Sequence, residues 1–265
     1  MEAFDTAKYG TVDHDVAYRT IDGQKIPMDV YYPAGGGPWA GVIFIHGGGW
    51  TDGDKAPLMG FPGETGYLLA SINYRMYPAY RFPAMIADVK CAIRYLRAHA
   101  AAYNLDPTRI GLLGHSAGGH LAALAGLAGE NAGWDGAPYR EQSSLVQAVI
   151  DLSGPTDLTR SFPDEISELI HNVFGPEQMV SGSPVHYAHP KAPPYLIIHG
   201  DADPVVPVEQ AHLLYKALAE TGAPVKKLIM HNAGHGLEPL TGPISPSAEE
   251  MLATILLFLA TYLKK

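Results

Sequence analysis

The stretch Leu112-Leu113-Gly114-His115-Ser116-Ala117-Gly118-Gly119-His120 places a serine between glycines directly after an apolar run. The run Ile110–Leu113 predicts a strand, and a helical pattern starts at Ala117. A sharp corner between a strand and a helix strains the backbone of the serine, and neighbours larger than glycine or alanine would clash there. Because Gly and Ser are also common in ordinary turns, the rest of the chain must decide whether Ser116 is a nucleophile.

Length and composition describe a globular chain. Its 265 residues are enough for one large α/β domain, and 47% of them are hydrophobic against 17% charged. The net charge of -9, without a basic cluster, argues against nucleic acid as a partner. The single cysteine, Cys91, excludes an intrachain disulfide and lies in an apolar helical pattern, so we expect it in the core.

Two further features bear on localisation. The first ten residues, "MEAFDTAKYG", lack the basic region and apolar core of a signal peptide. The longest apolar stretch, Met251–Leu263, is too short to span a bilayer and suits a buried terminal helix. We therefore expect a cytoplasmic protein without membrane insertion.

Strand-like and helix-like segments alternate along the chain. Val12–Tyr18 and Ile26–Tyr32 flank the turn Asp22-Gly23, which predicts an antiparallel hairpin. Continuous apolar runs follow, as in parallel strands covered on both faces, and helical patterns separate most of them; this alternation predicts an α/β fold with a doubly wound sheet. The runs are Gly41–Ile45, Tyr67–Ile72, Ile110–Leu113, Val146–Leu152, Tyr195–His199 and Lys227–Met230, and the helical patterns are Ala84–Ala101, Ala117–Leu127, Val208–Thr221 and Ala248–Leu263.

One long segment, Pro155–Pro194, does not fit the alternation. It has no clear strand pattern but carries several large apolar residues, so we expect a short helix within a small insertion above the carboxyl edge of the sheet. No linker indicates a second domain, and residues 1–265 are predicted to form a single domain with 155–194 as a cap-like insertion.

A serine nucleophile requires a base to take its proton, and the base requires an acid to fix its tautomer. Both are expected after Ser116, on loops that follow later strands. One such loop carries Asp201 and Asp203, and the next places His235 between two glycines. The order Ser116, Asp203, His235 is the one required; Asp201 lies nearer the strand and is expected to stabilise its own loop.

His231 and His235 have the i, i+4 spacing of a metal-binding pair. The residues between them, Asn-Ala-Gly, supply no glutamate of the metalloprotease type. We therefore expect no metal site.

The sequence His46-Gly47-Gly48-Gly49-Trp50 follows another buried strand. Three successive glycines allow backbone N–H groups to face a ligand, and acyl transfer requires such donors around its oxyanion. Ala117, directly after Ser116, supplies a further N–H group. No Gly-Lys-Ser/Thr follows, so the segment is not a phosphate-binding loop.

With these elements the chain resembles the α/β-hydrolases over nearly its whole length. More narrowly, it resembles esterases grouped with the bifunctional feruloyl/acetylxylan esterases, close to the hormone-sensitive-lipase family. This resemblance implies an eight-stranded, mostly parallel sheet whose second strand is antiparallel, helices on both faces, and no cofactor. The residues that carry it are "HGGGW" at 46–50, "ASINYR" at 70–75, "FPAMIADVKCAIRYLRAHAAAYNLDPTRIGLLGHSAGGHLAAL" at 82–124 and "PPYLIIHGDADPVVPVEQAHLLYKAL" at 193–218.

The resemblance also implies roles for individual residues. Ser116 would be the nucleophile, His235 the base and Asp203 the acid of a serine carboxylesterase acting on short-chain or small aromatic esters of the acetyl or feruloyl type. The oxyanion donors would be Gly48, Gly49 and Ala117, with the N–H group of Trp50 as an alternative. Apolar candidates for the substrate pocket are Trp50, Leu158, Phe162, Ile166 and Leu237.

Two other functions are considered. The "HGGGW" loop is also similar to that of arylformamidases, which cleave an amide, whereas some proteins of this fold bind ligands without turnover. Proteins of the latter kind commonly lack a triad member, and here all three residue types are present. A small-molecule ester is the expected partner, and the apolar C-terminal helix is compatible with a monomer or a homodimer.

Overall fold

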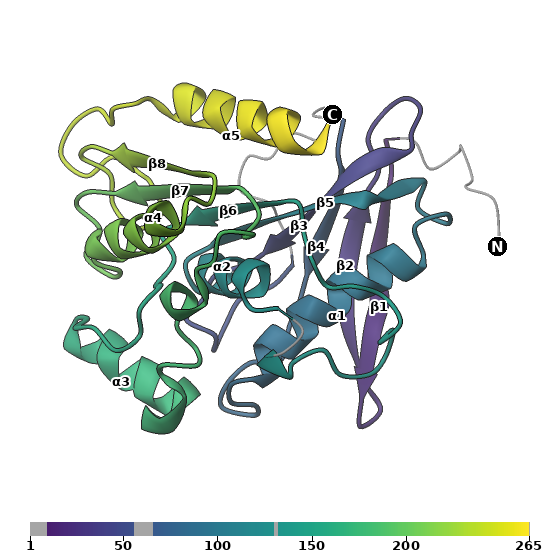
Figure 1. Cartoon of the computed structure of the whole chain (residues 1–265), viewed down its shortest axis with the longest axis horizontal. Helices are drawn as coiled ribbons and strands as arrows, with labels where there is room; N and C mark the ends of the chain where they lie inside the picture. Colours follow the sequence, from purple (N-terminus) through teal and green to yellow (C-terminus); the bar gives the residue numbers. More distant parts are fainter. Residues whose placement is uncertain (1–9, 56–65, 130–131, 265) are drawn as a thin grey trace.

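The computed structural model describes residues 10–55, 66–129 and 132–264. The N-terminal stretch considered above for a leader lies outside these ranges, apart from Gly10. Within the described ranges, one eight-stranded sheet has the strand order β1-β2-β4-β3-β5-β6-β7-β8 (Figure 1). The strands are β1 Val12–Ile21, β2 Gln24–Tyr31, β3 Trp39–Ile45, β4 Leu68–Ile72, β5 Leu105–His115, β6 Ala148–Leu152, β7 Tyr195–Gly200 and β8 Val225–Met230.

The sheet is mixed in the manner that the resemblance implied. β2 runs antiparallel to both β1 and β4, while β4, β3, β5, β6, β7 and β8 pair in parallel. The predicted hairpin is confirmed, because Asp22 and Gly23 have φ angles of 50° and 81° and so form the turn that suits the twist of β1 and β2. All seven residues of β3 are buried, which explains its unbroken apolar sequence.

Helices cover both faces of the sheet, as predicted (Figure 1). On one face, α5 (Ala248–Leu263) packs Phe258, Leu259 and their neighbours against the strands. On the other lie α1 (Ala84–Ala98), α2 (Ala117–Leu127) and α4 (Glu209–Thr221). None of the described helices is both long enough and apolar enough to cross a membrane.

Most differences from the predicted elements lie at their ends. Helix α1 ends at Ala98 and not at Ala101. Strand β5 begins at Leu105, five residues before the apolar run, because Leu105 pairs with Trp39 ahead of an irregularity in the ladder. A single pairing residue of this kind leaves no apolar pattern in the sequence.

The segment 155–194 contains one helix, α3 (Asp164–Phe174), and the short 3₁₀ turns η4 (Pro176–Gln178) and η5 (Pro184–Tyr187). It follows β6 and so leaves the sheet at the carboxyl end of the parallel strands, as expected. Helix α3 buries Ile170, Val173 and Phe174, and its other residues are exposed or partly buried.

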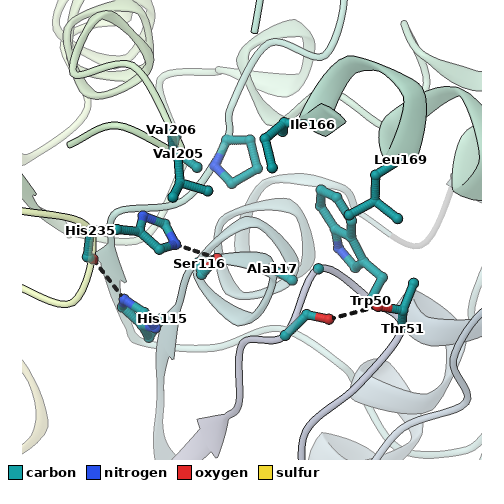
Figure 2. A pocket seen from close by; sticks show the side chains of 13 residues that line it. Trp50, Thr51, His115, Ser116, Ala117, Ile166, Leu169, Val205, Val206 and His235 are labelled. Carbon is teal, nitrogen blue, oxygen red and sulfur yellow. Dashed lines mark hydrogen bonds between the residues drawn. The ribbon is translucent and has the colours of Figure 1, made fainter. Parts of the chain in front are cut away.

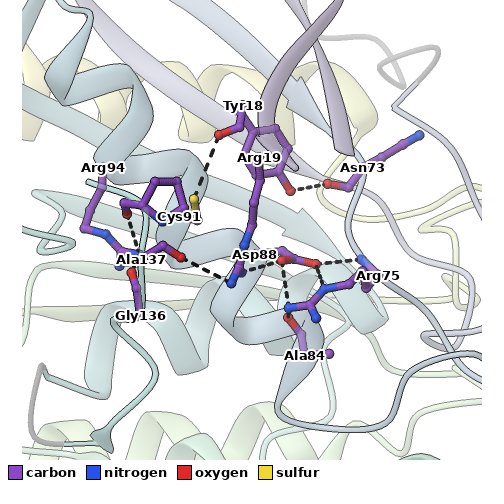
Figure 3. A network of polar contacts seen from close by, with 11 residues as sticks. Tyr18, Arg19, Asn73, Arg75, Ala84, Asp88, Cys91, Arg94, Gly136 and Ala137 are labelled. Carbon is purple, nitrogen blue, oxygen red and sulfur yellow. Dashed lines mark hydrogen bonds and ion pairs between the residues drawn. The ribbon is translucent and has the colours of Figure 1, made fainter. Parts of the chain in front are cut away.

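A buried ionic network joins β1, α1 and the loop after β4 (Figure 3). The Asp88 carboxylate, which has no exposed surface, accepts hydrogen bonds from Arg19 Nη1 at 2.6 Å and from Arg75 Nε at 2.9 Å. The backbone N–H of Arg75 donates to the same carboxylate at 2.9 Å. Cys91 is buried in the same helix, as predicted. The network thereby anchors the start of the loop that follows β4.

Candidate active site

Ser116 lies at the corner between β5 and α2 with φ 56° and ψ -121°, the strained geometry that the motif predicts. Its backbone N–H donates to the carbonyl of Leu152 on the neighbouring strand at 2.8 Å. Both flanking glycines are required by close backbone approach. A Cβ atom on Gly114 would lie 2.1 Å from the carbonyl oxygen of Gly118, and one on Gly118 would lie 2.0 Å from that of Ile45.

The structure brings Ser116, His235 and Asp203 into one hydrogen-bonded chain. His235 Nε2 lies 2.8 Å from Ser116 Oγ, and His235 Nδ1 lies 2.7 Å from Asp203 Oδ2. Asp203 follows β7 and His235 follows β8, so both side chains reach the corner from neighbouring strand ends. With Nδ1–H donating to the carboxylate, Nε2 is left to accept the serine proton.

Asp203 is held in its charged form. Its side chain is completely buried, and burial alone would raise its pKa, but hydrogen bonds from His199, His235 and the Val206 N–H keep the pKa well below the usual range. Asp203 Oδ1 accepts from the N–H groups of Val205 and Val206 at 2.8 and 2.9 Å. The carboxylate can therefore stabilise a positive charge on His235.

Asp201 lies elsewhere, at the surface. It accepts hydrogen bonds from His231 Nδ1 at 2.9 Å and from the Asn232 N–H at 2.7 Å, and so ties the loop after β7 to the end of β8. Asp201 was expected to stabilise its own loop, whereas the structure bonds it to the segment after β8. This contact also engages His231 away from His235, and no cluster of three or more potential ligands is placed to hold a metal ion in the described part of the chain.

The glycine loop after β3 is folded beside Ser116. Gly48, Gly49 and Trp50 have φ angles of 100°, 58° and 60°, and a Cβ atom on Gly48 would lie 2.0 Å from the carbonyl oxygen of Asp52. Within the described ranges, the N–H groups of Gly48, Gly49 and Ala117 form no hydrogen bond, although all three residues line the cavity at Ser116. Unpaired N–H groups that border a cavity are suited to bind an anionic oxygen.

The loop after β4 forms hydrogen bonds to both ends of the glycine loop. Tyr74 donates its hydroxyl proton to the carbonyl oxygen of His46 at 3.0 Å, and its ring stacks on the imidazole of His46. The N–H of Tyr77 donates to the carbonyl oxygen of Trp50 at 2.9 Å. Arg75 in the same loop is bound to Asp88. The loop after β4 therefore contacts both the ionic network and the glycine loop.

His115 is a site residue that the sequence analysis did not single out. Its Nε2–H donates to the carbonyl oxygen of His235 at 2.9 Å, and the His115 side chain also lines the cavity. Burial lowers the pKa of His115, so the imidazole is neutral at neutral pH and carries its one proton on Nε2, which faces this carbonyl. The sequence feature that could have identified His115 is its position at the end of β5, directly before Ser116.

A cavity of about 360 Å³ opens above Ser116 (Figure 2). Its walls are largely apolar. Two of the five residues predicted to line it, Trp50 and Ile166, do so. The residues around it are Gly48, Gly49, Trp50, Thr51, His115, Ser116, Ala117, Pro155, Ile166, Leu169, Val205, Val206 and His235.

The other three predicted pocket residues are in the hydrophobic cores. Leu158 and Phe162 pack into the core on the α2 face of the sheet, and Leu237 packs into the core beneath α5. Each is less than a tenth exposed. An apolar residue close to the site in sequence can point into a core instead of the cavity. Leu169, Val205 and Val206 line the cavity where Leu158, Phe162 and Leu237 were predicted to do so.

Comparison with known proteins assigns the chain to a family. The family model described as BD-FAE matches residues 28–218. The chain belongs to the BD-FAE family. The esterase LipQ of Mycobacterium tuberculosis (strain ATCC 25618 / H37Rv) is 35% identical to this BD-FAE chain over 211 residues, which cover 74% of this chain and 50% of LipQ.

Two solved structures have the same fold over nearly the whole chain. A truncated carbohydrate esterase from gut microbiota superposes with a TM-score of 0.82 at 27% identity, covering 100% of both chains. Esterase 2 of the planctomycete Thermogutta terrifontis, solved with butyrate bound, gives a TM-score of 0.76 at 27% identity and covers 96% of this chain and 93% of that one.

This BD-FAE chain therefore has the α/β-hydrolase fold, and the relatives named above are esterases. The chain spans about half the length of the curated relatives it matches.

Proposed function

We propose that this BD-FAE chain is a serine carboxylesterase that hydrolyses short-chain or small aromatic esters. The observation that carries the proposal is the hydrogen-bonded chain from Ser116 Oγ through His235 to Asp203, at 2.8 and 2.7 Å. It opens onto a cavity bordered by N–H groups that have no hydrogen-bond partner among the described residues. A nucleophile, a base, an acid and oxyanion donors are the parts that acyl transfer to serine requires.

Acylation begins when Ser116 Oγ attacks the carbonyl carbon of the ester while His235 Nε2 takes the serine proton. The electron pair of the C=O bond moves to the oxygen, and the N–H groups of Gly48, Gly49 and Ala117 stabilise the resulting oxyanion. When the tetrahedral intermediate collapses, the bond to the leaving oxygen breaks and His235 delivers its proton to the alcohol. Ser116 is then acylated.

Deacylation repeats the sequence with water. His235 Nε2 takes a proton from water as its oxygen attacks the acyl carbon, and then returns that proton to Ser116 Oγ as the carboxylic acid leaves. Asp203 remains ionised throughout and stabilises the imidazolium. The low pKa of Asp203 supports this role, because the carboxylate does not compete for the proton.

The size and lining of the cavity support small substrates. A volume of about 360 Å³ is near the lower end of ligand cavities, and apolar side chains from α3 and from the loop after β7 form its walls. The related esterase 2 has been solved with butyrate and with propionate bound. A short aliphatic acyl group, an acetyl group or a compact aromatic acyl group would be compatible with this space.

The experiment that tests the function is a series of p-nitrophenyl esters from acetate to palmitate, with Ser116→Ala as the control. We expect the highest kcat/KM for acyl chains of about two to six carbons, and activity in Ser116→Ala lower by about 10⁴-fold or more. Methyl ferulate and N-formylkynurenine complete the panel. Cleavage of the formamide without ester turnover would favour an arylformamidase, and an inert wild-type protein would overturn the enzymatic assignment.

A further inference from the structure

One neutral imidazole connects the three segments that surround the reacting serine. His120, on α2 just after Ser116, has no exposed surface. Its Nδ1 accepts a hydrogen bond from the indole Nε1–H of Trp50 at 3.2 Å, and its Nε2–H donates to the carbonyl oxygen of Gly182 at 2.7 Å. The glycine loop, the nucleophile helix and the insertion at 155–194 therefore meet at this single side chain.

The protonation of His120 follows from its surroundings. Burial lowers its pKa to about 4, so the imidazole is neutral at physiological pH and carries one proton. Because the Trp50 indole can only donate, Nδ1 must be the bare nitrogen, and Nε2 must carry the proton that Gly182 accepts. Both ring nitrogens of His120 therefore have a hydrogen-bond partner, and these two bonds fix its tautomer.

Aromatic packing reinforces these contacts. The rings of Trp50 and His120 each meet Phe174, at the end of α3, nearly at right angles, with centroids 5.0 and 5.4 Å apart. Gly182 packs so closely on Phe174 that a Cβ atom would lie 2.7 Å from its ring. The indole of Trp50 also borders the cavity over Ser116 (Figure 2).

Trp50 is the residue that follows Gly48 and Gly49, and its own φ of 60° is unfavourable for a bulky side chain. A run of glycines has high backbone freedom, so its conformation must be imposed by anchors at its ends. Tyr74 anchors the first end through the carbonyl oxygen of His46. At the second end, the Trp50 side chain is anchored by His120.

We propose that His120 is a positioning residue that holds Trp50 and, through it, keeps the Gly48 and Gly49 N–H groups aimed at the oxyanion. The inference rests on the function proposed above. Since these donors act on the charge that develops in the transition state, their misplacement affects kcat and leaves substrate binding nearly unchanged.

Two amide substitutions separate the two hydrogen bonds of His120. In His120→Asn the side-chain oxygen can take the place of Nδ1 and accept from Trp50, whereas in His120→Gln the side-chain amide can reach Gly182 but leaves the indole N–H unpaired. We expect kcat of His120→Asn within about threefold of wild type, and kcat of His120→Gln and His120→Leu lower by about 10-fold or more, with KM changed by less than twofold.

A double-mutant cycle with Trp50→Phe keeps the test informative if His120→Leu fails to fold. Removal of the indole N–H should lower kcat on its own, and adding His120→Gln should then cause little further loss. Additive losses would overturn the proposal, as would equal kcat values in folded His120→Asn and His120→Gln. If wild type is inactive on every ester or Ser116→Ala retains activity, the proposed function fails instead.

Discussion

Asp88 and Asp203 are both completely buried carboxylates, but their partners differ. Asp88 is bound by the guanidinium groups of Arg19 and Arg75, which are charged at any physiological pH. Asp203 is bound by the imidazoles of His199 and His235 and by backbone N–H groups. The first arrangement has a fixed charge and supports the fold. The second places His235 between a carboxylate and Ser116, which is the arrangement that the proposed acyl transfer requires.

The largest effect is expected from Asp203→Asn, which replaces the responsive carboxylate with an amide. The amide can donate to His235 Nδ1 and so favour the wrong tautomer, with the proton on the nitrogen that faces Ser116. We expect kcat for a short p-nitrophenyl ester to fall by about 10⁴-fold with the fold retained. Steady-state kinetics and circular dichroism measure the two quantities.

Asp201→Asn is the matched control, because it lies two residues away and also binds a histidine, but at the surface. Its kcat should stay within about twofold of wild type. Comparable losses in the two variants would mean that the loop, and not the contact between Asp203 and His235, determines activity.

Asp88→Asn should have a large effect on stability instead. The substitution leaves Arg19 and Arg75 buried without their charged partner, so we expect the free energy of unfolding to fall by about 3–5 kcal/mol, measured by urea denaturation. Glu220→Gln, in an exposed pair with Lys216, should change it by less than about 1 kcal/mol. An Asp88→Asn protein as stable as wild type would contradict the supporting role of this network.

Asp151 is a third buried carboxylate, and among the described residues it forms no ion pair. Burial raises its pKa to about 6, despite opposing effects from His199 and the Gly154 N–H. The folded state therefore binds an extra proton between the ordinary pKa and about 6, and the free energy of unfolding falls as the pH rises through that window. The resulting cost is complete above pH 6 and absent below the ordinary pKa.

Asp151→Asn should remove this cost while its side-chain oxygen still accepts from Gly154. We expect the variant to be more stable than wild type by about 1–2 kcal/mol at pH 8, since the new amide protons offset part of the gain. The difference should shrink toward pH 4.5. Urea denaturation at both pH values measures it, and a variant less stable than wild type at pH 8 would contradict the assignment.

The sequence predicted those parts of the molecule that depend on local pattern and chain order. The strand–helix alternation, the hairpin at Asp22-Gly23 and the meeting of Ser116, Asp203 and His235 all follow from residues that act within one element or at one strand end. Parallel strands bring their carboxyl ends to one edge, so three loops that are distant in sequence had to converge there.

Contacts between distant segments were not predictable in the same way. Arg19 and Asp88 are 69 positions apart, and nothing local in either segment indicates their pairing. His120 is one histidine among 12, and its hydrogen-bond partners, Trp50 and Gly182, lie in two other segments. The incorrect predictions for Leu158 and Phe162 have a related cause. An apolar segment indicates that its side chains are buried, but it does not show whether they face the protein core or the cavity.

The two glycines that flank Ser116 affect how activity can be inferred from related sequences. Gly114 and Gly118 are required because main-chain carbonyl groups occupy the space where a side chain would stand, whatever residue lies between them. A descendant that lost the serine hydroxyl would still need both glycines to cross from strand to helix. The glycines are therefore a mark of the architecture, whereas Ser116, His235 and Asp203 are the residues that the proposed chemistry requires.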